Sequence, residues 1–168
     1  MMSKKYITKS FIVNFLIFFC IFLLDRFTKK IVIILDGKNF GEQIYTSSYL
    51  NIHLIWNQGI AFGLFSNIEK FLYNILSIII IIIILVIIAM ILKNNGIKRT
   101  SLIFILGGAV GNLYDRVLFS AVPDFLDFHI KDFHWFIFNF ADIFISVGVI
   151  LLIFIDLFGN KEKENEQL

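Results

Sequence analysis

This sequence of 168 residues contains little charge, one cysteine and one proline. Only 17% of its residues are charged, against about 25% in an ordinary soluble domain. Hydrophobic residues make up 58%, and the mean hydropathy is +0.85, so the chain is predicted to be a membrane protein. Its Lys and Arg residues form no stripe interleaved with aromatic residues, which argues against a nucleic-acid partner.

The single cysteine, Cys20, excludes an intrachain disulfide. It lies in an apolar stretch, and we interpret it as a small buried hydrophobic side chain. The alternative is a lipid-modified cysteine of a signal sequence. That alternative is disfavoured because the bulky Phe18 and Phe19 stand where a cleavage site needs small residues.

No second His or Cys lies at ligand spacing from His53, which is therefore expected on a strand face and not at a metal.

Four apolar segments are long enough to cross a bilayer as helices, which takes about 20 residues. They cover approximately residues 10–30, 71–92, 100–118 and 136–158. Because no small-residue cleavage site follows the first segment, we favour a retained anchor over a cleaved signal peptide. The predicted fold class is an α-helical polytopic membrane protein with four transmembrane helices.

The regions between these segments differ in character. Residues 36–67 are mixed and alternate around Tyr49 to Trp56, which is typical of short strands, so we expect a small extracytoplasmic β element. Residues 121–135 are expected to form a polar-aromatic loop. Residues 1–160 would then be a single membrane-embedded domain, followed by a solvated cytoplasmic tail at residues 161–168.

An even number of spans places both termini on the same side of the membrane. Basic residues are more frequent at the termini and in the turn between the second and third spans, and such residues favour the cytoplasmic side. They are Lys4, Lys5, Lys9, Lys93, Lys98, Arg99, Lys161 and Lys163, against Lys38, Lys70 and Lys131 on the other side. We therefore expect both termini in the cytoplasm.

Polar residues recur on one face of the third span. Gly108, Asn112 and Asp115 have the spacing i, i+4, i+7, and nearby glycines would let helices pack closely. Asp115 is expected to pair with the adjacent Arg116 and to be structural, not catalytic. In the first span, Asp25 and Lys29 have the spacing of a helical salt bridge.

Asp124 and Asp142 are the candidate acid and base. Asp124 follows Pro123, which restricts the backbone, and Asp142 lies one turn after Asn139. If the third and fourth spans pack side by side, the two carboxylates would meet and share a proton, as general acid–base catalysis requires. The alternative, that both simply cap or solvate helix ends, remains open.

Together these stretches resemble the bacterial lipoprotein signal peptidase family (signal peptidase II), over nearly the whole chain. Each motif is weak alone, but the set and its order are specific. The motifs are Asp25-Arg26-Phe27-Thr28-Lys29, Asn57-Gln58-Gly59-Ile60-Ala61-Phe62, Gly107-Gly108-Ala109-Val110-Gly111-Asn112-Leu113-Tyr114-Asp115-Arg116, Val122-Pro123-Asp124-Phe125 and Phe138-Asn139-Phe140-Ala141-Asp142.

The resemblance implies a membrane aspartic endopeptidase of the bacterial inner membrane, with Asp124 and Asp142 as its catalytic dyad. The substrate implied is a prolipoprotein, cut before its diacylglyceryl-modified cysteine near the extracytoplasmic face, among membrane lipids. No metal or organic cofactor is implied, and globomycin is the expected inhibitor. The residues implied to line or support the site are Asp25, Lys29, Asn57, Gly108, Asn112, Asp115, Arg116, Asn139 and Ala141.

Two positions depart from the family pattern, Pro123 and Gln58, and neither is a carboxylate. They are expected to affect loop rigidity or inhibitor fit.

Two other functional classes compete with the peptidase. A proton or ion transporter would also use intramembrane carboxylates, but no pair of broken helices suggests a midplane site. A membrane scaffold would tolerate Asn at both Asp124 and Asp142.

Overall fold

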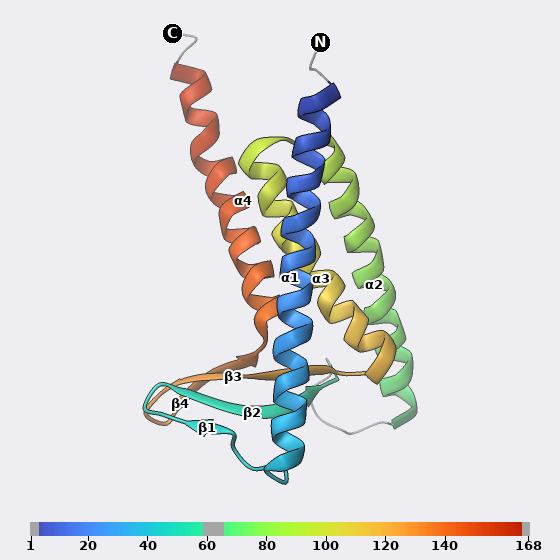
Figure 1. Ribbon diagram of the computed structural model, residues 1–168, viewed down its shortest axis with the longest axis vertical. Helices are drawn as coiled ribbons and strands as arrows, with labels where there is room; N and C mark the ends of the chain where they lie inside the picture. The colour runs from blue at the N-terminus through green and yellow to red at the C-terminus, as the bar shows by residue number, and fades with distance from the viewer. Residues whose placement is uncertain (1–3, 59–65, 166–168) are drawn as a thin grey trace.

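A computed structural model describes the backbone of residues 4–58 and 66–165, and the side chains of residues 11–58 and 73–158. Four helices form a bundle, and a small antiparallel sheet closes one end of it (Figure 1). The start of α1 and the end of α4 lie at the opposite end of the bundle from the sheet. The elements are α1 (Lys4–Lys38), β1 (Tyr45–Thr46), β2 (Leu50–Asn57), α2 (Ser66–Lys93), α3 (Gly96–Phe119), β3 (Val122–Ile130), β4 (Phe133–Phe138) and α4 (Phe140–Asn165).

Each helix contains a segment long and apolar enough to cross a membrane, as the predicted fold class requires. These segments are Phe11–Lys38, Tyr73–Lys93, Gly96–Phe119 and Phe140–Phe158. The helix α1 continues unbroken to Lys38, beyond the predicted end of the first span near Lys30. Asp25, Arg26 and Lys29 are paired inside the protein, so they do not interrupt the helix. At the other end of the chain, the helix α4 reaches Asn165, where an unfolded tail was expected.

Helix α3 is the centre of the bundle and contacts the other three helices. Its buried face carries Gly108, Asn112 and Asp115, as the i, i+4, i+7 spacing predicts. A Cβ added at Gly108 would overlap the carbonyl oxygen of Ala141 on α4, and one at Gly107 would lie 2.7 Å from Ile21 on α1. The glycines therefore bring α3 into close contact with its neighbours.

Outside this centre, most apolar side chains of the helices point away from the bundle. Phe11, Ile78 and Ile150, for example, are all at least half exposed. Cys20 is exposed as well, so the prediction that it is buried is wrong. In a membrane span, lipid solvates apolar side chains as well as a protein core does, so low polarity does not predict burial.

The sheet has the strand order β1-β2-β3-β4 with every neighbouring pair antiparallel. Strand β2 confirms the strand that the alternation predicts. The prediction of a loop at residues 121–135 is wrong, because this region forms β3, a turn and most of β4. The helix α4 begins at Phe140, whereas the sequence predicts a start near residue 136. Pairing with β2 satisfies the backbone of β3, while Phe125 and Leu126 pack against Val32 of α1. The strand β3 is thereby held beneath the bundle.

Candidate active site

Charged side chains of α1 and α3 meet inside the bundle. Lys29 Nζ lies 2.9 Å from Asp25 Oδ1 and 2.7 Å from Asp115 Oδ2. Arg26 pairs with both carboxylates, and its Nη2 also donates to the carbonyl oxygen of Gly111 over 3.0 Å. Asp25, Lys29 and Asp115 are at most 2% exposed, so two cations balance two anions where little water reaches. The predicted Asp25–Lys29 pair is part of this cluster.

The predicted pair between Asp115 and Arg116 is wrong. Asp115 pairs with Arg26 and Lys29, whereas Arg116 Nη1 donates to the carbonyl oxygen of Asn112 over 3.3 Å. Asp115 thus reaches across to α1, whereas the guanidinium of Arg116 bonds to the backbone of its own helix. Arg116 therefore stands beside the cluster of predicted site residues and not within its ion pairs.

Two asparagine side chains connect the charged cluster to the candidate dyad. Lys29 Nζ donates to Asn112 Oδ1 over 2.8 Å, and Asn112 Nδ2 donates to Asp142 Oδ1 over 2.8 Å. Asn139 Nδ2 donates to Asp124 Oδ1 over 2.6 Å and lies 3.3 Å from Asn112 Oδ1. Asn112 and Asn139 therefore each donate to one carboxylate of the candidate dyad.

Asp124 lies near the start of β3 and is 4% exposed. Its second oxygen accepts a hydrogen bond of 2.8 Å from Asn57 Nδ2, across the β2–β3 pair. Burial raises the pKa of the Asp124 carboxyl, and the charge of Asp142 raises it further, against the two amide hydrogen bonds and Lys29. The net shift upward favours a protonated Asp124.

Asp142 lies in the first turn of α4 and forms a capping box with Asn139. The backbone N–H of Asn139 donates to Asp142 Oδ2 over 3.1 Å, and the N–H of Asp142 donates to Asn139 Oδ1 over 3.2 Å. Helix capping, the alternative role considered for this residue, therefore occupies one carboxylate oxygen. The other oxygen faces Asn112, so a single side chain caps α4 and also takes part in the polar cluster.

At Ala141 and Gly111, the helices α4 and α3 lie close to the carboxylate of Asp25 on α1. Ala141 is fully buried, and its backbone N–H donates to Asp25 Oδ1 over 3.2 Å. A Cβ at Gly111 would lie 2.6 Å from Asp25 Oδ2. Only small residues leave room for the carboxylate of Asp25 between α3 and α4.

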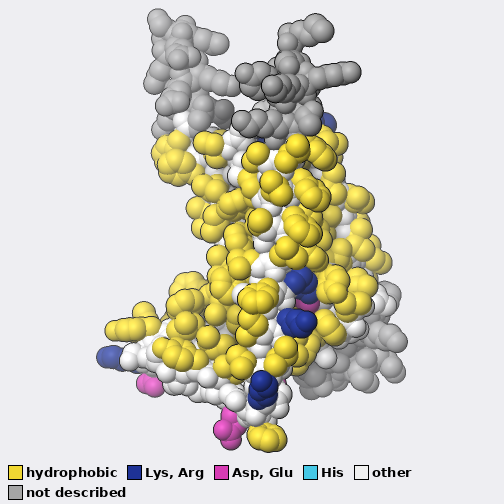
Figure 2. All heavy atoms as spheres, in the orientation of Figure 1, with side chains coloured by type: hydrophobic (Ala, Val, Ile, Leu, Met, Phe, Trp, Pro, Cys, Tyr) yellow, Lys and Arg dark blue, Asp and Glu magenta, His cyan; other side chains and the backbone are white. Residues whose placement is uncertain are grey.

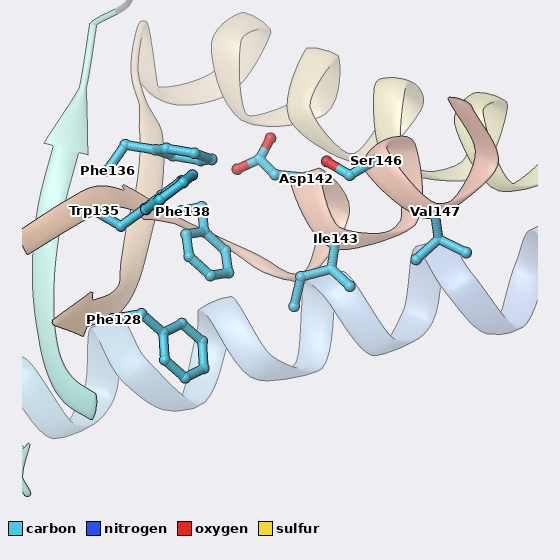
Figure 3. Close-up of a pocket in the computed structure, with 8 residues that line it drawn as sticks. All are labelled: Phe128, Trp135, Phe136, Phe138, Asp142, Ile143, Ser146 and Val147. Carbon is cyan, nitrogen blue, oxygen red and sulfur yellow. The ribbon is translucent and has the colours of Figure 1, made fainter. Parts of the chain in front are cut away.

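An apolar cavity of about 360 Å³ opens beside Asp142 (Figure 3). The Asp142 carboxylate points toward the ring of Phe136, and the Ser146 hydroxyl points back toward Asp142. Aromatic side chains of the sheet form one wall and α4 forms the other. The cavity is lined by Phe128, Trp135, Phe136, Phe138, Asp142, Ile143, Ser146 and Val147. A carboxylate therefore faces a space suited to an apolar chain.

Sequence reasoning missed this cavity and the role of Arg26. The cavity wall comes from β4, which was expected to be partly loop and partly helix, so its aromatic residues carried no signal of a shared surface. Arg26 stands within a predicted motif, but its pairing with Asp115 spans 89 positions and is decided by the packing of α1 on α3. Residues 59–62 of the predicted Asn57 motif lie outside the described residues.

No group of three or more potential ligands in the described ranges could hold a metal ion. The polar cluster instead consists of carboxylates, amides and two paired cations. Such a set can hold a proton between two carboxylates and exclude water from the ion pairs around them.

Comparison with known proteins identifies the family of this chain. Residues 17–158 match the family described as "Signal peptidase (SPase) II". A lipoprotein signal peptidase of Pelagibacter ubique is 48% identical over 95% of this chain and 96% of its own length. That of Alteromonas mediterranea is 34% identical over 87% and 80%, respectively. A bacterial membrane enzyme solved by the in meso method at 1.9 Å resolution superposes with a TM-score of 0.71 at 32% identity, over 87% of this chain and 92% of that one. The chain belongs to the signal peptidase II family.

Proposed function

We propose that this protein is an aspartic endopeptidase of the bacterial inner membrane that removes signal peptides from prolipoproteins. It cleaves the bond before the diacylglyceryl-modified cysteine. The observation that carries the proposal is the pair Asp124 and Asp142, which the connected amides of Asn139 and Asn112 hold, with Asp142 lining an apolar cavity. The family membership supports the peptidase activity and the substrate class.

In the proposed reaction, Asp142 is ionised and Asp124 holds the proton that the pair shares. Asp142 takes a proton from water, and the resulting hydroxide attacks the carbonyl carbon of the residue before the lipidated cysteine. Asp124 gives its proton to the carbonyl oxygen. The tetrahedral intermediate then collapses: Asp124 takes back a proton from one of its two hydroxyls as the carbonyl re-forms, the C–N bond breaks, and Asp142 gives its proton to the departing amine.

The other predicted site residues would position this dyad. Asn57 and Asn139 orient Asp124, and Asn112 orients Asp142. Asp25, Lys29 and Asp115 anchor Asn112, while Gly108 and Ala141 allow the close helix contact. Arg116 lies one turn beyond Asn112, where it would meet the bound substrate.

The proposed membrane orientation places both termini in the cytoplasm and the sheet with the dyad at the extracytoplasmic face. The basic residues near the termini favour this orientation. The precursor would enter laterally with its acyl chains in the outer leaflet and its signal peptide against the apolar cavity. Globomycin would then compete for the same site.

The test is cleavage of a purified lipid-modified precursor by the full-length protein, beside the same precursor without lipid. Wild-type protein should cleave only the lipid-modified form, and Asp124→Asn and Asp142→Asn should each abolish cleavage. Asp132→Asn, in the exposed β3–β4 turn, is the matched control and should cleave normally. Cleavage by Asp124→Asn at the wild-type rate, or equal cleavage of both precursors, would contradict the proposal.

A further inference from the structure

A groove separate from the cavity beside Asp142 runs between α1 and α3. Its volume is about 430 Å³, and it shares no lining residue with the cavity beside Asp142. It is lined by Phe22, Arg26, Lys29, Lys30, Ile33, Ile34, Tyr114, Asp115 and Phe119. Figure 2 shows basic side chains, with an acidic one between them, set in a mostly hydrophobic surface at the front of the bundle, over α1.

One of the three basic side chains that line the groove, Lys30, has a charge that no acidic side chain among the described residues neutralises. Arg26 and Lys29 pair with Asp25 and Asp115, which leaves these four side chains neutral together. Lys30 is exposed on the same wall, and it forms no ion pair with any residue that the structure describes. A ligand that complements the groove therefore carries a net negative charge.

Arg26 is held in an orientation that leaves one of its N–H groups available for a hydrogen bond to a ligand. Its guanidinium carbon lies 4.7 Å from the ring centre of Tyr114 and 5.7 Å from that of Phe22. Of its five N–H groups, those on Nε and Nη2 and one on Nη1 donate to Asp25, Asp115 and Gly111. The second N–H of Nη1 meets no acceptor among the described residues, and Lys30 stands one turn further along the same face.

The remaining walls are apolar and follow the direction of the helices. Ile33 and Ile34 continue the stripe of α1 beyond Lys30, and Tyr114 and Phe119 form the facing wall on α3. A ligand that places an anion at Arg26 and Lys30 would lay apolar chains along this wall. Among molecules of a membrane, an anionic phospholipid has this combination, because it joins a negatively charged phosphate to two apolar chains.

We propose that the groove between α1 and α3 binds an anionic diacyl phospholipid, with the phosphate diester at Arg26 and Lys30. The diacylglyceryl group of a prolipoprotein carries no phosphate, so this ligand differs from the proposed substrate. Lys29 lines the groove and donates to Asn112, which donates to Asp142, so the bound lipid lies next to the network that holds the dyad.

The experiment is native mass spectrometry of the full-length protein in detergent, titrated with phosphatidylglycerol and, separately, with the zwitterionic phosphatidylethanolamine. Wild-type protein should bind phosphatidylglycerol about fivefold more tightly, the contribution of one basic side chain. Lys30→Gln should remove this preference. Lys38→Gln, which removes the same charge from the end of α1, should keep it. Equal affinity of wild-type protein for the two lipids, or unchanged phosphatidylglycerol binding by Lys30→Gln, would overturn the proposal.

Two further arms identify which part of the lipid is recognised. Ile34→Trp narrows the groove and should weaken phosphatidylglycerol binding, whereas Leu23→Trp on the exposed outer face of α1 should not. Glycerol phosphate at millimolar concentration should fail to displace the lipid, and displacement would show a free-phosphate site instead. Lipid binding is the readout throughout, so these results are independent of cleavage activity.

Discussion

The ammonium group of Lys29 lies 2.8 Å from Oδ1 of Asn112, which places a buried cation of α1 one amide away from the dyad. The Nδ2 of the same amide lies 2.8 Å from Asp142 Oδ1. An asparagine side chain offers one acceptor and two donors, and here it uses each kind toward a different charged group. The ion-pair cluster and the two carboxylates therefore form one connected network.

Replacing Asn112 should reduce catalysis more than stability. Asn112→Leu keeps the volume but removes the donor to Asp142 and the acceptor for Lys29. Losing a hydrogen bond to a charged group should lower the cleavage rate by about one to two orders of magnitude. Asn94→Leu, in the exposed turn before α3, is the control. A fully active Asn112→Leu would mean that Asp142 needs no partner on α3.

Replacing Lys29 should destabilise the bundle. Lys29→Met keeps the long side chain but leaves Asp25 and Asp115 with Arg26 alone, and removing one partner of a buried pair costs about 3–5 kcal/mol. Thermal unfolding in detergent measures this loss. A second change, Asp115→Asn, should restore part of the stability because it removes the unbalanced charge.

The control for that experiment is Lys98→Met. Lys98 pairs with Asp156 over 2.7 Å, but both side chains are at least one-third exposed, and exposed pairs contribute about 0–1 kcal/mol. Similar losses in Lys29→Met and Lys98→Met would contradict the view that burial makes the Lys29 pairs important.

Asp124→Asn should become more stable relative to the wild type as the pH rises. The pKa of Asp124 in the folded protein is raised above its ordinary value of 3.8, chiefly by burial. A raised pKa means that the protonated carboxyl contributes stability at low pH, and that this contribution is lost as the pH rises through the folded-state pKa. The neutral amide does not titrate, so the variant keeps its stability.

The measurement is the melting temperature of wild type and Asp124→Asn from pH 4 to pH 8. The difference should grow in favour of the variant across this range, while Asp132→Asn provides a comparison from the exposed turn. If the wild type instead gained stability over the variant with rising pH, Asp124 would be stabilised as an anion. The proposed proton on Asp124 would then be assigned wrongly.

Gly108→Ala should force α3 and α4 apart. The added Cβ would overlap the Ala141 carbonyl oxygen and lie 2.8 Å from Ile145 Cγ1. The backbone oxygen cannot move aside without shifting α4, so we expect a loss of about 1–3 kcal/mol together with lower activity. Gly37→Ala is the matched control, because no atom lies within 4 Å of its added Cβ. Unchanged unfolding of Gly108→Ala would show that the helix contact is loose.

The fold class and much of the candidate site could be predicted because their signals are local. A run of about 22 uncharged residues ending at Leu92 predicts a span wherever it lies in the fold. Likewise, the spacing of Gly108, Asn112 and Asp115 places them on one helical face before any tertiary contact is known. The two candidate carboxylates also stand out, because ionisable groups at the edge of hydrocarbon are costly without a partner.

Element boundaries and charge partners were decided by the tertiary structure. The helix α1 continues through Asp25 and Lys29 because α3 supplies Asp115 to the same cluster, and no local pattern contains that partner. The strand β3 forms because β2 pairs with its backbone, although its sequence suggests a loop.

The sequence by itself therefore determined four membrane spans, a small β element, and a short set of polar residues from which the site is built. The tertiary structure alone decided that Asp115 pairs with Arg26 and Lys29 and not with Arg116, and that Asn112 and Asn139 bring Asp124 and Asp142 together. The physical reason is that apolar length and helical spacing are properties of neighbouring residues. The pairing of a buried charge instead depends on which distant side chain reaches it.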